Sequence, residues 1–391
     1  MKKVFIVAAL RTPTGKLLGA LSSLTAPALG AAVIKAILKK SVEPSAVDEV
    51  IMGNVLSAGV GQNPARQAAL GAGLPNSINA FTVNKVCASG MKAVSLGAQA
   101  IMTGESEVII AGGMESMSNA PYLLREMRRG KKYGDSGVID SMVFDGLMDC
   151  YYSEHMGALC ESTVEKYNIT REQQDAFALA SHQKASRATR EGLFNDELVI
   201  VEAAGRRIAE DESIRINTRL EALSKLKPVF QKNGTVTAGN SPGLNDGAAA
   251  LLLASEEGLK RLGKKPLAEI IGFESSHTDP KWFTIAPTGS VKKLLAATGL
   301  KMEEFDLVEE NEAFAAQTLA IIKELSLDPS IVNIHGGAVA LGHPIGASGA
   351  RILTTLVHGL RKRKKELGLA TICLGGGGAM SMAVKAMEEE A

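Results

Sequence analysis

Aromatic side chains are rare in this sequence, and neither sign of charge is in excess. Aromatics make up only 4% of the 391 residues, and the formal net charge is +1. A balanced charge gives no electrostatic basis for binding a nucleic acid or an anionic membrane surface. No apolar run approaches the about 20 residues of a membrane-spanning helix. We therefore expect a soluble, cytoplasmic protein with no nucleic-acid or membrane partner.

Cysteine is also scarce, and its spacing argues against the common metal sites. The four cysteines, Cys87, Cys150, Cys160 and Cys373, form no CxxC pair and no close cluster with histidine. A zinc site is therefore improbable, and a disulfide framework is not expected in a chain of this size. The sequence also lacks GxGxxG after its first strand and lacks the spacing of a P-loop. We predict no metal and no cofactor.

What the sequence does contain is an alternation of apolar strands and alanine-rich helices. The apolar run of residues 4–10 is short and has no cleavage-type sequence, so it is interpreted as a strand rather than a signal peptide. Strands predicted at 4–8, 49–54, 80–84 and 108–113 alternate with helices predicted at 26–40, 64–71 and 87–104. This alternation predicts an α/β fold with a mostly parallel sheet covered on both faces.

Between residues 118 and 243 the sequence is more polar and irregular. Helices are predicted over 155–167 and from Thr170, where Thr170 and Gln173 form a capping box, and a loop is predicted at 240–243. The basic run 125–132 is interpreted as a solvated face, with a phosphate or subunit contact as the minority alternative. We interpret the whole region as an insertion that builds a lid or a binding surface.

The second half of the chain repeats the first. Residues 306–311 echo 48–54, Ala347-Ser348-Gly349 echoes Ala88-Ser89-Gly90, and 371–376 echo 108–113, at nearly constant offsets of 258, 259 and 263 residues. Collinear matches of this kind indicate a duplicated α/β unit. The predicted divisions are an N-terminal half (1–117 plus 244–267), an inserted loop domain (118–243) and a C-terminal half (268–391).

Cys87 stands where a predicted strand turns sharply into a helix. Small residues surround it in Val83–Ala93, which reads VNKVCASGMKA, so a thioester could approach closely. The positive end of the following helix is expected to favour thiolate over thiol. A buried structural cysteine is the alternative, but this setting favours Cys87 as a nucleophile.

The C-terminal half supplies further polar groups in or beside glycine-rich segments. Asn311 follows a strand predicted at 305–309, His343 lies in the glycine-rich loop of residues 336–346, and four glycines closely follow Cys373. Successive glycines offer backbone N–H groups that could stabilise an oxyanion, although a plain turn is the alternative. One thiol and a histidine suggest covalent acyl transfer, and the second thiol suggests a separate acid/base.

These motifs resemble the thiolase family, specifically its acetyl-CoA C-acetyltransferases (acetoacetyl-CoA thiolases). The resemblance covers essentially the whole chain, and it is carried by VNKVCASGMKA, NEAF at 311–314, GGAVALGHPIGASGAR at 336–351 and CLGGGGAM at 373–380. It implies a five-layered α-β-α-β-α fold with an inserted loop domain. It also implies a reversible Claisen condensation of two acetyl-CoA to acetoacetyl-CoA and CoA, by a ping-pong mechanism.

The resemblance also implies a role for each catalytic residue. Cys87 would carry the acyl group as a thioester, and His343 would activate it. Cys373 would remove the α-proton of the second acetyl-CoA, or return it in thiolysis. Asn311 would hold a water that completes one oxyanion hole with His343, and the backbone N–H groups of Cys87 and Gly375 would form the other.

The substrates implied are acetyl-CoA, acetoacetyl-CoA and CoA. The His155-Met156 pair is typical of the short-chain members. The residues expected to contact the acyl group and CoA are Leu147, His155, Met156, Arg215, Phe230, Ala238, Ser241, Ala313 and Phe314. Pro242 stands where related enzymes usually have a serine against the pantetheine arm, which removes a donor there. A homotetramer built from dimers, with the insertion making tetramer contacts, is also implied.

Three other readings compete with this one. A long-chain 3-ketoacyl-CoA thiolase of β-oxidation would use the same catalytic residues and differ in pocket depth. A condensing enzyme of the ketosynthase kind would pair one cysteine with two histidines or with histidine and asparagine, so Cys373 argues against it. A non-catalytic acyl-CoA or lipid carrier would be supported by loss of Cys87, His343 or Cys373, and all three are present.

Overall fold

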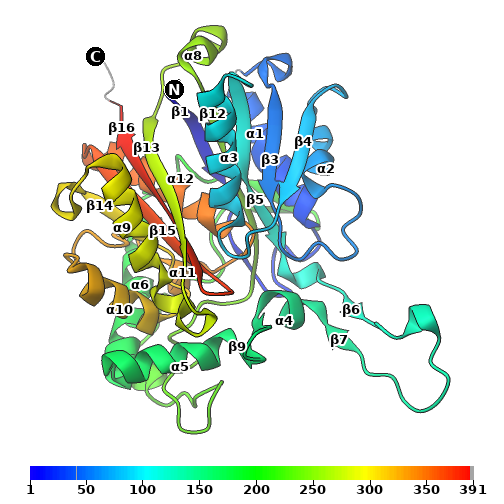
Figure 1. Cartoon of the computed structure of the whole chain (residues 1–391), viewed down its shortest axis with the longest axis vertical. Coiled ribbons are helices and arrows are strands. Elements are labelled where there is room, and N and C mark those ends of the chain that lie inside the picture. Colours follow the sequence, from blue (N-terminus) through cyan, green and yellow to red (C-terminus); the bar gives the residue numbers. More distant parts are fainter. Residues whose placement is uncertain (41, 388–391) are drawn as a thin grey trace.

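The computed structural model describes residues 1–40 and 42–387, so the last four residues of the predicted C-terminal half lie outside the description. Its centre is one ten-stranded sheet with the order β14-β15-β16-β13-β1-β12-β5-β3-β4, and β2 pairs with β12 (Figure 1). The strands of this sheet are β1 (Phe5–Arg11), β2 (Gly15–Lys16), β3 (Glu49–Gly53), β4 (Asn79–Val83), β5 (Val108–Ser116), β12 (Asn245–Ala254), β13 (Ala268–His277), β14 (Leu307–Glu310), β15 (Leu367–Leu374) and β16 (Gly378–Ala386).

The principal helices lie close to their predicted positions in the N-terminal half. The helices that pack on the sheet are α1 (Ala26–Lys39), α2 (Pro64–Gly71), α3 (Ser89–Thr103), α8 (Glu256–Leu262), α9 (Ala286–Thr298), α10 (Ala315–Leu325) and α12 (Ser348–Arg363), whereas α11 (Ala338–Leu341) packs against α6 (Arg171–Arg190). Helix α1 begins after Thr25, whose side chain caps it. Pro27 fits in the first turn, because backbone N–H groups there have no partner within the helix.

The predicted duplication is visible in the order of the strands. The first half runs β4-β3-β5-β12-β1 and the second runs β14-β15-β16-β13. In the second half, Val308 of β14 forms a single parallel β-bridge with Val332. This bridge lies beside β14 as β4 lies beside β3 in the first half. The halves join at a short antiparallel pairing of Phe5 and Ile6 with Glu269 and Ala268.

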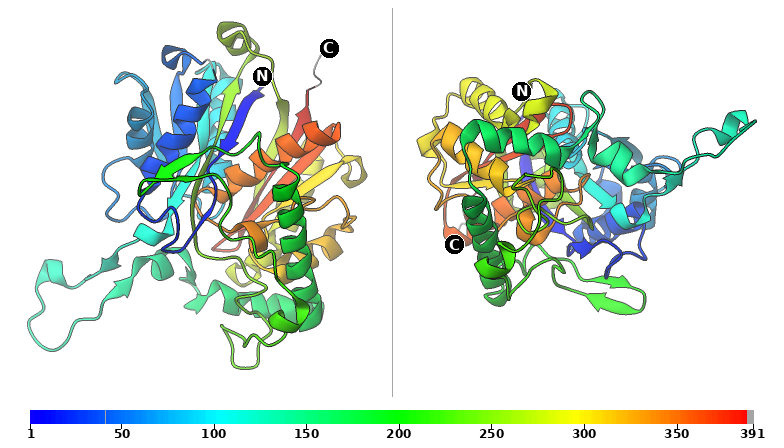
Figure 2. Two further views of the ribbon diagram at one scale, coloured as in Figure 1. Left: turned by 180° about the vertical axis from the view of Figure 1, so that it is seen from behind. Right: turned by 90° about the horizontal axis from the view of Figure 1, so that it is seen from below.

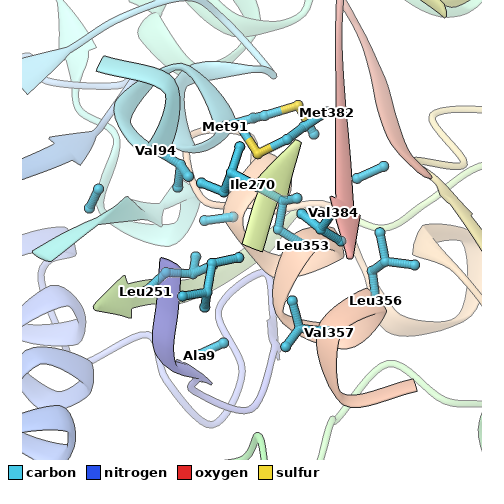
Figure 3. Packing of buried hydrophobic residues seen from close by; sticks show 14 of the residues in the cluster. Ala9, Met91, Val94, Leu251, Ile270, Leu353, Leu356, Val357, Met382 and Val384 are labelled. Carbon is cyan, nitrogen blue, oxygen red and sulfur yellow. The ribbon is translucent and has the colours of Figure 1, made fainter. Parts of the chain in front are cut away.

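Helices and sheet form five layers, α-β-α-β-α. Helices α1 and α2 cover the outer face of the first half, and α9 and α10 cover that of the second. Helices α3 and α12 lie together between the two halves, where they share the largest apolar core. Figure 3 shows that core, with side chains from α3, α12, β12, β13 and β16 converging, among them Met91, Val94, Leu251, Ile270, Leu353, Leu356, Val357, Met382 and Val384.

The two central helices approach each other through glycine. A Cβ added to Gly349 would lie 2.6 Å from the backbone nitrogen of Met91, and one added to Gly90 would lie 2.9 Å from that of Ala350. Gly90 and Gly349 are the matched positions of the repeat. The duplication therefore places its two equivalent turns against each other at the middle of the molecule.

The sheet is not mostly parallel, which corrects the sequence prediction. Only the pairs β3–β4, β3–β5 and β14–β15 are parallel, whereas β12 pairs antiparallel with both β1 and β5. The hairpin β15–β16 is antiparallel as well. Strands buried on both faces are continuously apolar whichever way their neighbours run, so the sequence pattern did not distinguish the two arrangements.

Residues 118–243 form a layer of helices and loops below the sheet in Figure 1 and one projecting arm. This segment holds α4 (Ser141–Gly146), α5 (Met156–Tyr167), α6 (Arg171–Arg190) and α7 (Leu220–Leu223), with the short pairs β6 (Tyr122–Leu123)/β7 (Ile139–Asp140), β8 (Met148–Asp149)/β9 (Glu154–His155) and β10 (Val201–Ala203)/β11 (Arg206–Ile208). The predicted capping box of Thr170 and Gln173 is present at the start of α6. The arm carries the basic run 125–132, which is largely exposed, and projects away from the body (Figure 2). The predicted boundaries of the three divisions stay a prediction.

A helix that crosses a membrane has to be both long and apolar. Within residues 1–40 and 42–387, no helix is both long and apolar enough to cross a membrane.

Candidate active site

The turn before α3 holds Cys87 in a strained backbone. Val86 adopts a left-handed conformation with φ of 48°, which is rare for a β-branched residue. The turn is fixed by Ser89, whose hydroxyl donates to the carbonyl of Val86 at 2.6 Å and accepts from the N–H of Lys85 at 2.8 Å. Helix α3 begins at Ser89, two residues later than predicted, so Cys87 lies in the turn itself.

The sulfur of Cys87 is surrounded by backbone donors from both halves. The backbone N–H groups of Cys87 and Gly375 both lower the pKa of this thiol, and these are the two groups that the resemblance assigns to an oxyanion hole. Burial nevertheless raises the pKa of the Cys87 thiol to about 12, and the charge of Glu115 adds to the increase. The predicted preference for thiolate is therefore wrong for this state, because loss of solvation outweighs the two donors and the helix end.

The His343 ring is held in place by its own loop. Its Nδ1 lies 2.6 Å from Oγ of Ser348, and its backbone N–H donates to Oδ1 of Asn245 at 2.9 Å. The Ser348 hydroxyl donates to the carbonyl of Pro344 at 2.9 Å, so its oxygen is free to accept from Nδ1–H. This assigns the proton to Nδ1 and leaves Nε2 as the basic nitrogen. Burial, with a smaller effect of Arg351, lowers the pKa of His343 to about 3, so the ring is neutral.

Glu115, at the end of β5, connects the two halves around Cys87, and sequence reasoning missed it. Its Oε1 accepts from the Asn54 side chain at 2.7 Å and from Leu56 N–H at 3.2 Å. Its Oε2 accepts from Val55 N–H at 3.1 Å and from Gly346 N–H, in the His343 loop, at 2.9 Å. Burial raises the pKa of Glu115 to about 7 despite these donors. A buried glutamate ending a glycine-rich apolar strand is the signal that could have identified it.

Cys373 lies near the end of β15, inside an apolar cluster. Its Sγ donates to Oε1 of Gln317 at 3.2 Å. Burial raises the pKa of the Cys373 thiol well above its usual value, and the nearby Cys87 and Glu310 add to the increase. The structure brings the segments of the two predicted thiols together, because a Cβ added to Gly375, two residues after Cys373, would lie 3.5 Å from the side chain of Val86, which precedes Cys87.

Asn311 offers a free amide next to this cluster. It follows β14 directly, and its backbone N–H donates to the carbonyl of Thr371 at 3.0 Å. Both Oδ1 and Nδ2 of its side chain are buried, and neither has a partner among the residues that the structure describes. A buried amide without a partner is costly, which fits a group that binds water or substrate.

Several of the predicted acyl-site residues form one apolar wall. The ring of His155 stacks on Phe230 with centroids 4.6 Å apart, and Phe230 meets Phe314 edge-on at 6.2 Å. Ala313, Phe314, Met156 and Phe230 pack in the same cluster as Cys373, while Leu147 packs in the cluster that includes Cys87. His155 also caps α5, because its Nδ1 accepts from Gly157 N–H at 3.1 Å, so this helix begins one residue later than predicted.

The remaining predicted CoA residues lie in the inserted segment. Arg215 is exposed and lines a hollow of about 230 Å³ together with His182 and Arg190 of α6. Ala238 is exposed, whereas Ser241 is buried and its hydroxyl has no partner within residues 1–40 and 42–387. The predicted loop at 240–243 is confirmed, because neither helix nor strand includes these residues. Over the same described residues, no group of three or more His, Cys, Asp and Glu side chains is arranged to hold a metal ion.

The sequence and fold match known proteins over nearly their whole length. Residues 4–257 match the family described as thiolase, N-terminal domain, and residues 264–386 match thiolase, C-terminal domain. The chain is 50% identical over 390 residues to a probable acetyl-CoA acyltransferase of Staphylococcus aureus, covering 98% of this chain and 99% of that one. It is 50% identical over 388 residues to the acetyl-CoA acetyltransferase of Pseudomonas aeruginosa, with coverage of 98% and 99%.

A solved structure is similar as well. The crystal structure of the Bacillus anthracis acetyl-CoA acetyltransferase superposes with a TM-score of 0.96 at 42% identity, covering 99% of each chain. These matches confirm the predicted family and the five-layered α/β fold. The chain belongs to the thiolase family and is an acyltransferase.

Proposed function

We propose that this protein is an acetyl-CoA C-acetyltransferase that condenses two acetyl-CoA to acetoacetyl-CoA and CoA, and catalyses the reverse thiolysis. The observation that carries the proposal is the approach of the Cys373 strand end to the Cys87 turn, where a Cβ added to Gly375 would lie 3.5 Å from the Val86 side chain. The loop of His343 reaches the same place, because Ile345 packs in the cluster that includes Cys87. A nucleophile, a neutral base and a second acid/base are the groups that this chemistry needs.

In the first half-reaction, the basic Nε2 of His343 takes the proton of Cys87 as the sulfur attacks the carbonyl carbon of acetyl-CoA. The C–S bond to CoA breaks, and CoA leaves with the proton from His343. The backbone N–H groups of Cys87 and Gly375 meet the developing charge. Burial raises the pKa of Cys87 and lowers that of His343, so neither ion is favoured at rest and we infer that proton transfer accompanies the attack.

In the second half-reaction, the thiol proton of Cys373 first leaves to solvent, and the resulting thiolate removes a methyl proton from a second acetyl-CoA. The carbanion forms a C–C bond with the acetyl carbonyl, the bond to Cys87 breaks, and acetoacetyl-CoA departs. The proton on Cys373 returns to the Cys87 sulfur before the next turnover. Asn311, with its unpartnered amide, and His343 are suited to hold the enolate oxygen through a water.

A short acyl chain is supported by the position of Met156. A Cβ added to Gly375 would lie 3.8 Å from the Met156 methyl carbon, so this side chain stands beside the donor to the Cys87 sulfur. The stacked rings of His155 and Phe230 extend the wall. An acetyl group fits such a confined space, whereas a long chain needs a channel through it.

The remaining parts of the proposal concern CoA and assembly. Arg215 is suited to the phosphates of CoA, with Ala238 and Ser241 along the pantetheine arm, and no cofactor beyond CoA esters is needed. A homotetramer in the cytoplasm, with the projecting arm between dimers, is supported by the apolar side chains exposed there, including Leu124, Met127 and Val138.

A broader acyl-CoA range is the second candidate. The Staphylococcus aureus relative is named an acyltransferase rather than an acetyltransferase. A thiolase of β-oxidation would share the thiols and the histidine described above and accept longer 3-ketoacyl-CoA.

Mass mapping after brief incubation with acetoacetyl-CoA and acid quench tests the proposal. The peptide that carries Cys87 should gain one acetyl group, and added free CoA should remove it. Labelling by a C8–C16 3-ketoacyl-CoA but not by acetoacetyl-CoA would favour the broader enzyme. If neither ester labels Cys87, the acyl-transfer mechanism is wrong and a non-catalytic carrier has to be considered.

A further inference from the structure

Gln317, on the first turn of α10, touches the second thiol and is itself completely buried. Its Oε1 accepts from Sγ of Cys373 at 3.2 Å. Its Nε2 donates to Oε1 of Glu310 at 2.5 Å and to the backbone carbonyl of Asn311 at 3.1 Å. One amide therefore contacts three groups, two of which belong to the proposed catalytic set.

The orientation of this amide is determined by its neighbours. Glu310 and the Asn311 carbonyl are both acceptors, so both N–H bonds of Nε2 are occupied. Rotating the amide by half a turn would place its oxygen against a carboxyl group and a carbonyl oxygen, which is unfavourable. The carbonyl oxygen of Gln317 is thereby fixed toward Cys373.

The position of Glu310 does not depend on Cys373. Its other oxygen accepts from the Thr318 hydroxyl at 2.6 Å, and its backbone is held by Asn333 through bonds of 2.8 Å on each side. Burial raises the pKa of Glu310 well above its usual value, but Oε1 accepts from Gln317 whether the carboxyl group is ionised or protonated. The chain Glu310–Gln317–Cys373 is therefore held at its far end by the scaffold.

We propose that Gln317 is a positioning residue that aims the thiol of Cys373 and sets its place relative to Asn311. This inference rests on the proposed function of Cys373 and identifies what holds that group. The contact of 3.2 Å between Sγ and Oε1 of Gln317 fixes the side-chain rotamer of Cys373, and with it the position of the sulfur that takes the proton from the substrate carbon.

Loss of Gln317 should affect only the step in which the C–C bond forms or breaks. In condensation, the C–H bond of acetyl-CoA breaks, its electron pair forms the new C–C bond, and the proton goes to Cys373. In thiolysis the same proton returns to carbon. The exchange of acetyl between CoA and Cys87 requires Cys87 and His343 and makes no demand on Cys373. Loss of Gln317 should therefore separate the two half-reactions.

The test compares Gln317→Met, which keeps the volume but removes the polar contacts, with Thr318→Val. Thr318 donates to the same Glu310 carboxyl group without touching Cys373, so its replacement disturbs the cluster to a similar degree. Two rates are measured for each folded variant: exchange of labelled CoA into acetyl-CoA, and formation of acetoacetyl-CoA. We expect Gln317→Met to lower condensation at least about tenfold while exchange stays within about twofold. Thr318→Val should leave the ratio of the two rates unchanged.

A third variant keeps the inference testable if the methionine variant does not fold. The carboxyl group in Gln317→Glu can accept from Cys373 and donate to Glu310 at the same time only when it is protonated. The condensation rate of this variant should therefore rise as the pH falls, while its exchange rate should not. Equal losses of exchange and condensation, no loss in Gln317→Met, or a pH-independent Gln317→Glu would each overturn the role. Absence of both activities from the unmodified protein would instead refute the proposed function.

Discussion

Nδ1 of His343 lies 2.6 Å from the hydroxyl oxygen of Ser348, five residues further along the same loop and helix. The hydroxyl in turn donates to the Pro344 carbonyl, so the serine accepts the imidazole proton and leaves Nε2 free. The sequence places Ser348 in the repeated Ala-Ser-Gly element, but only the structure shows that it orients the base.

Replacing Ser348 with alanine should therefore slow acylation of Cys87. The imidazole would lose its fixed tautomer and orientation, and we expect the rate to fall about 10- to 100-fold with little change in KM. Rapid-quench measurement of acetyl-Cys87 formation checks this. Ser95→Ala, which removes another buried serine whose hydroxyl bonds only within α3, is the control. An unchanged acylation rate would remove the orienting role.

Replacing Glu115 with alanine should destabilise the protein by about 3–5 kcal/mol, because four buried donors lose their acceptor. Denaturant unfolding compares it with the native protein. Glu115→Gln keeps one acceptor oxygen and should be intermediate. If the alanine variant loses less than about 1 kcal/mol, water replaces the carboxylate and Glu115 is not the link between the halves.

Replacing Met156 with alanine should widen the acyl-chain range. The side chain stands beside Gly375, so its removal opens space next to the Cys87 sulfur. We expect kcat/KM for C6–C8 3-ketoacyl-CoA to rise about tenfold relative to acetoacetyl-CoA. Met102→Ala, on the far end of α3, serves as the control. An unchanged ratio would show that another residue limits chain length.

Acid should destabilise the protein partly through His335. Burial lowers the pKa of this ring to about 4, so its neutral form is favoured in the folded state. The contribution is complete above the unfolded value of about 6.5 and is lost as the pH falls toward 4, which amounts to about 1.4 kcal/mol between pH 7.5 and 5.5. Urea unfolding at the two pH values should show a smaller loss for His335→Gln than for the native protein. Equal losses would contradict the lowered pKa.

Replacing Gly349 with alanine should abolish most activity while leaving the strands in place. Its new methyl group would lie 2.6 Å from the Met91 nitrogen, so α12 and α3 would have to separate. Cys87 precedes α3 and His343 precedes α12, and a shift of about 1 Å between them can cost about 100-fold in rate. Gly137→Ala, where an added Cβ would meet nothing within 4 Å and the backbone is not left-handed, controls for the loss of a glycine. Full activity in Gly349→Ala would show that α3 and α12 can move apart without disturbing the site.

The sequence predicted most of the scaffold because its signals are local. Thr25, Pro64 and Thr170 mark helix starts by capping chemistry alone, and each helix begins where expected. Strand direction was mispredicted because β5 and β12 are apolar over most of their length, with polar residues at one end only, and are separated by the whole insertion. Pairing across such a distance is a property of the folded core.

At the candidate site, the sequence could indicate the proposed catalytic residues but not the residues that hold them. Cys87, His343 and Cys373 stand out as rare residue types in glycine-rich loops. Glu115, Gln317 and Ser348 are ordinary polar residues in helices and strands, and only their buried contacts identify them. The thiolate prediction failed for the same reason, because the sequence does not show how far the sulfur of Cys87 is removed from water.

The close packing of α3 against α12 at Gly90 and Gly349 places side by side two equivalent turns that carry different residues. Two identical chains related by a twofold axis must present the same residue on both sides of it. Here the two sides differ: Cys87 stands three residues before Gly90, and Gly346 stands three residues before Gly349. In a single chain each side can differ, so one carries Cys87, the proposed nucleophile, and the other carries Gly346 and the loop of His343. The single chain can thus hold one reactive centre on an axis where a symmetric pair would have to crowd two.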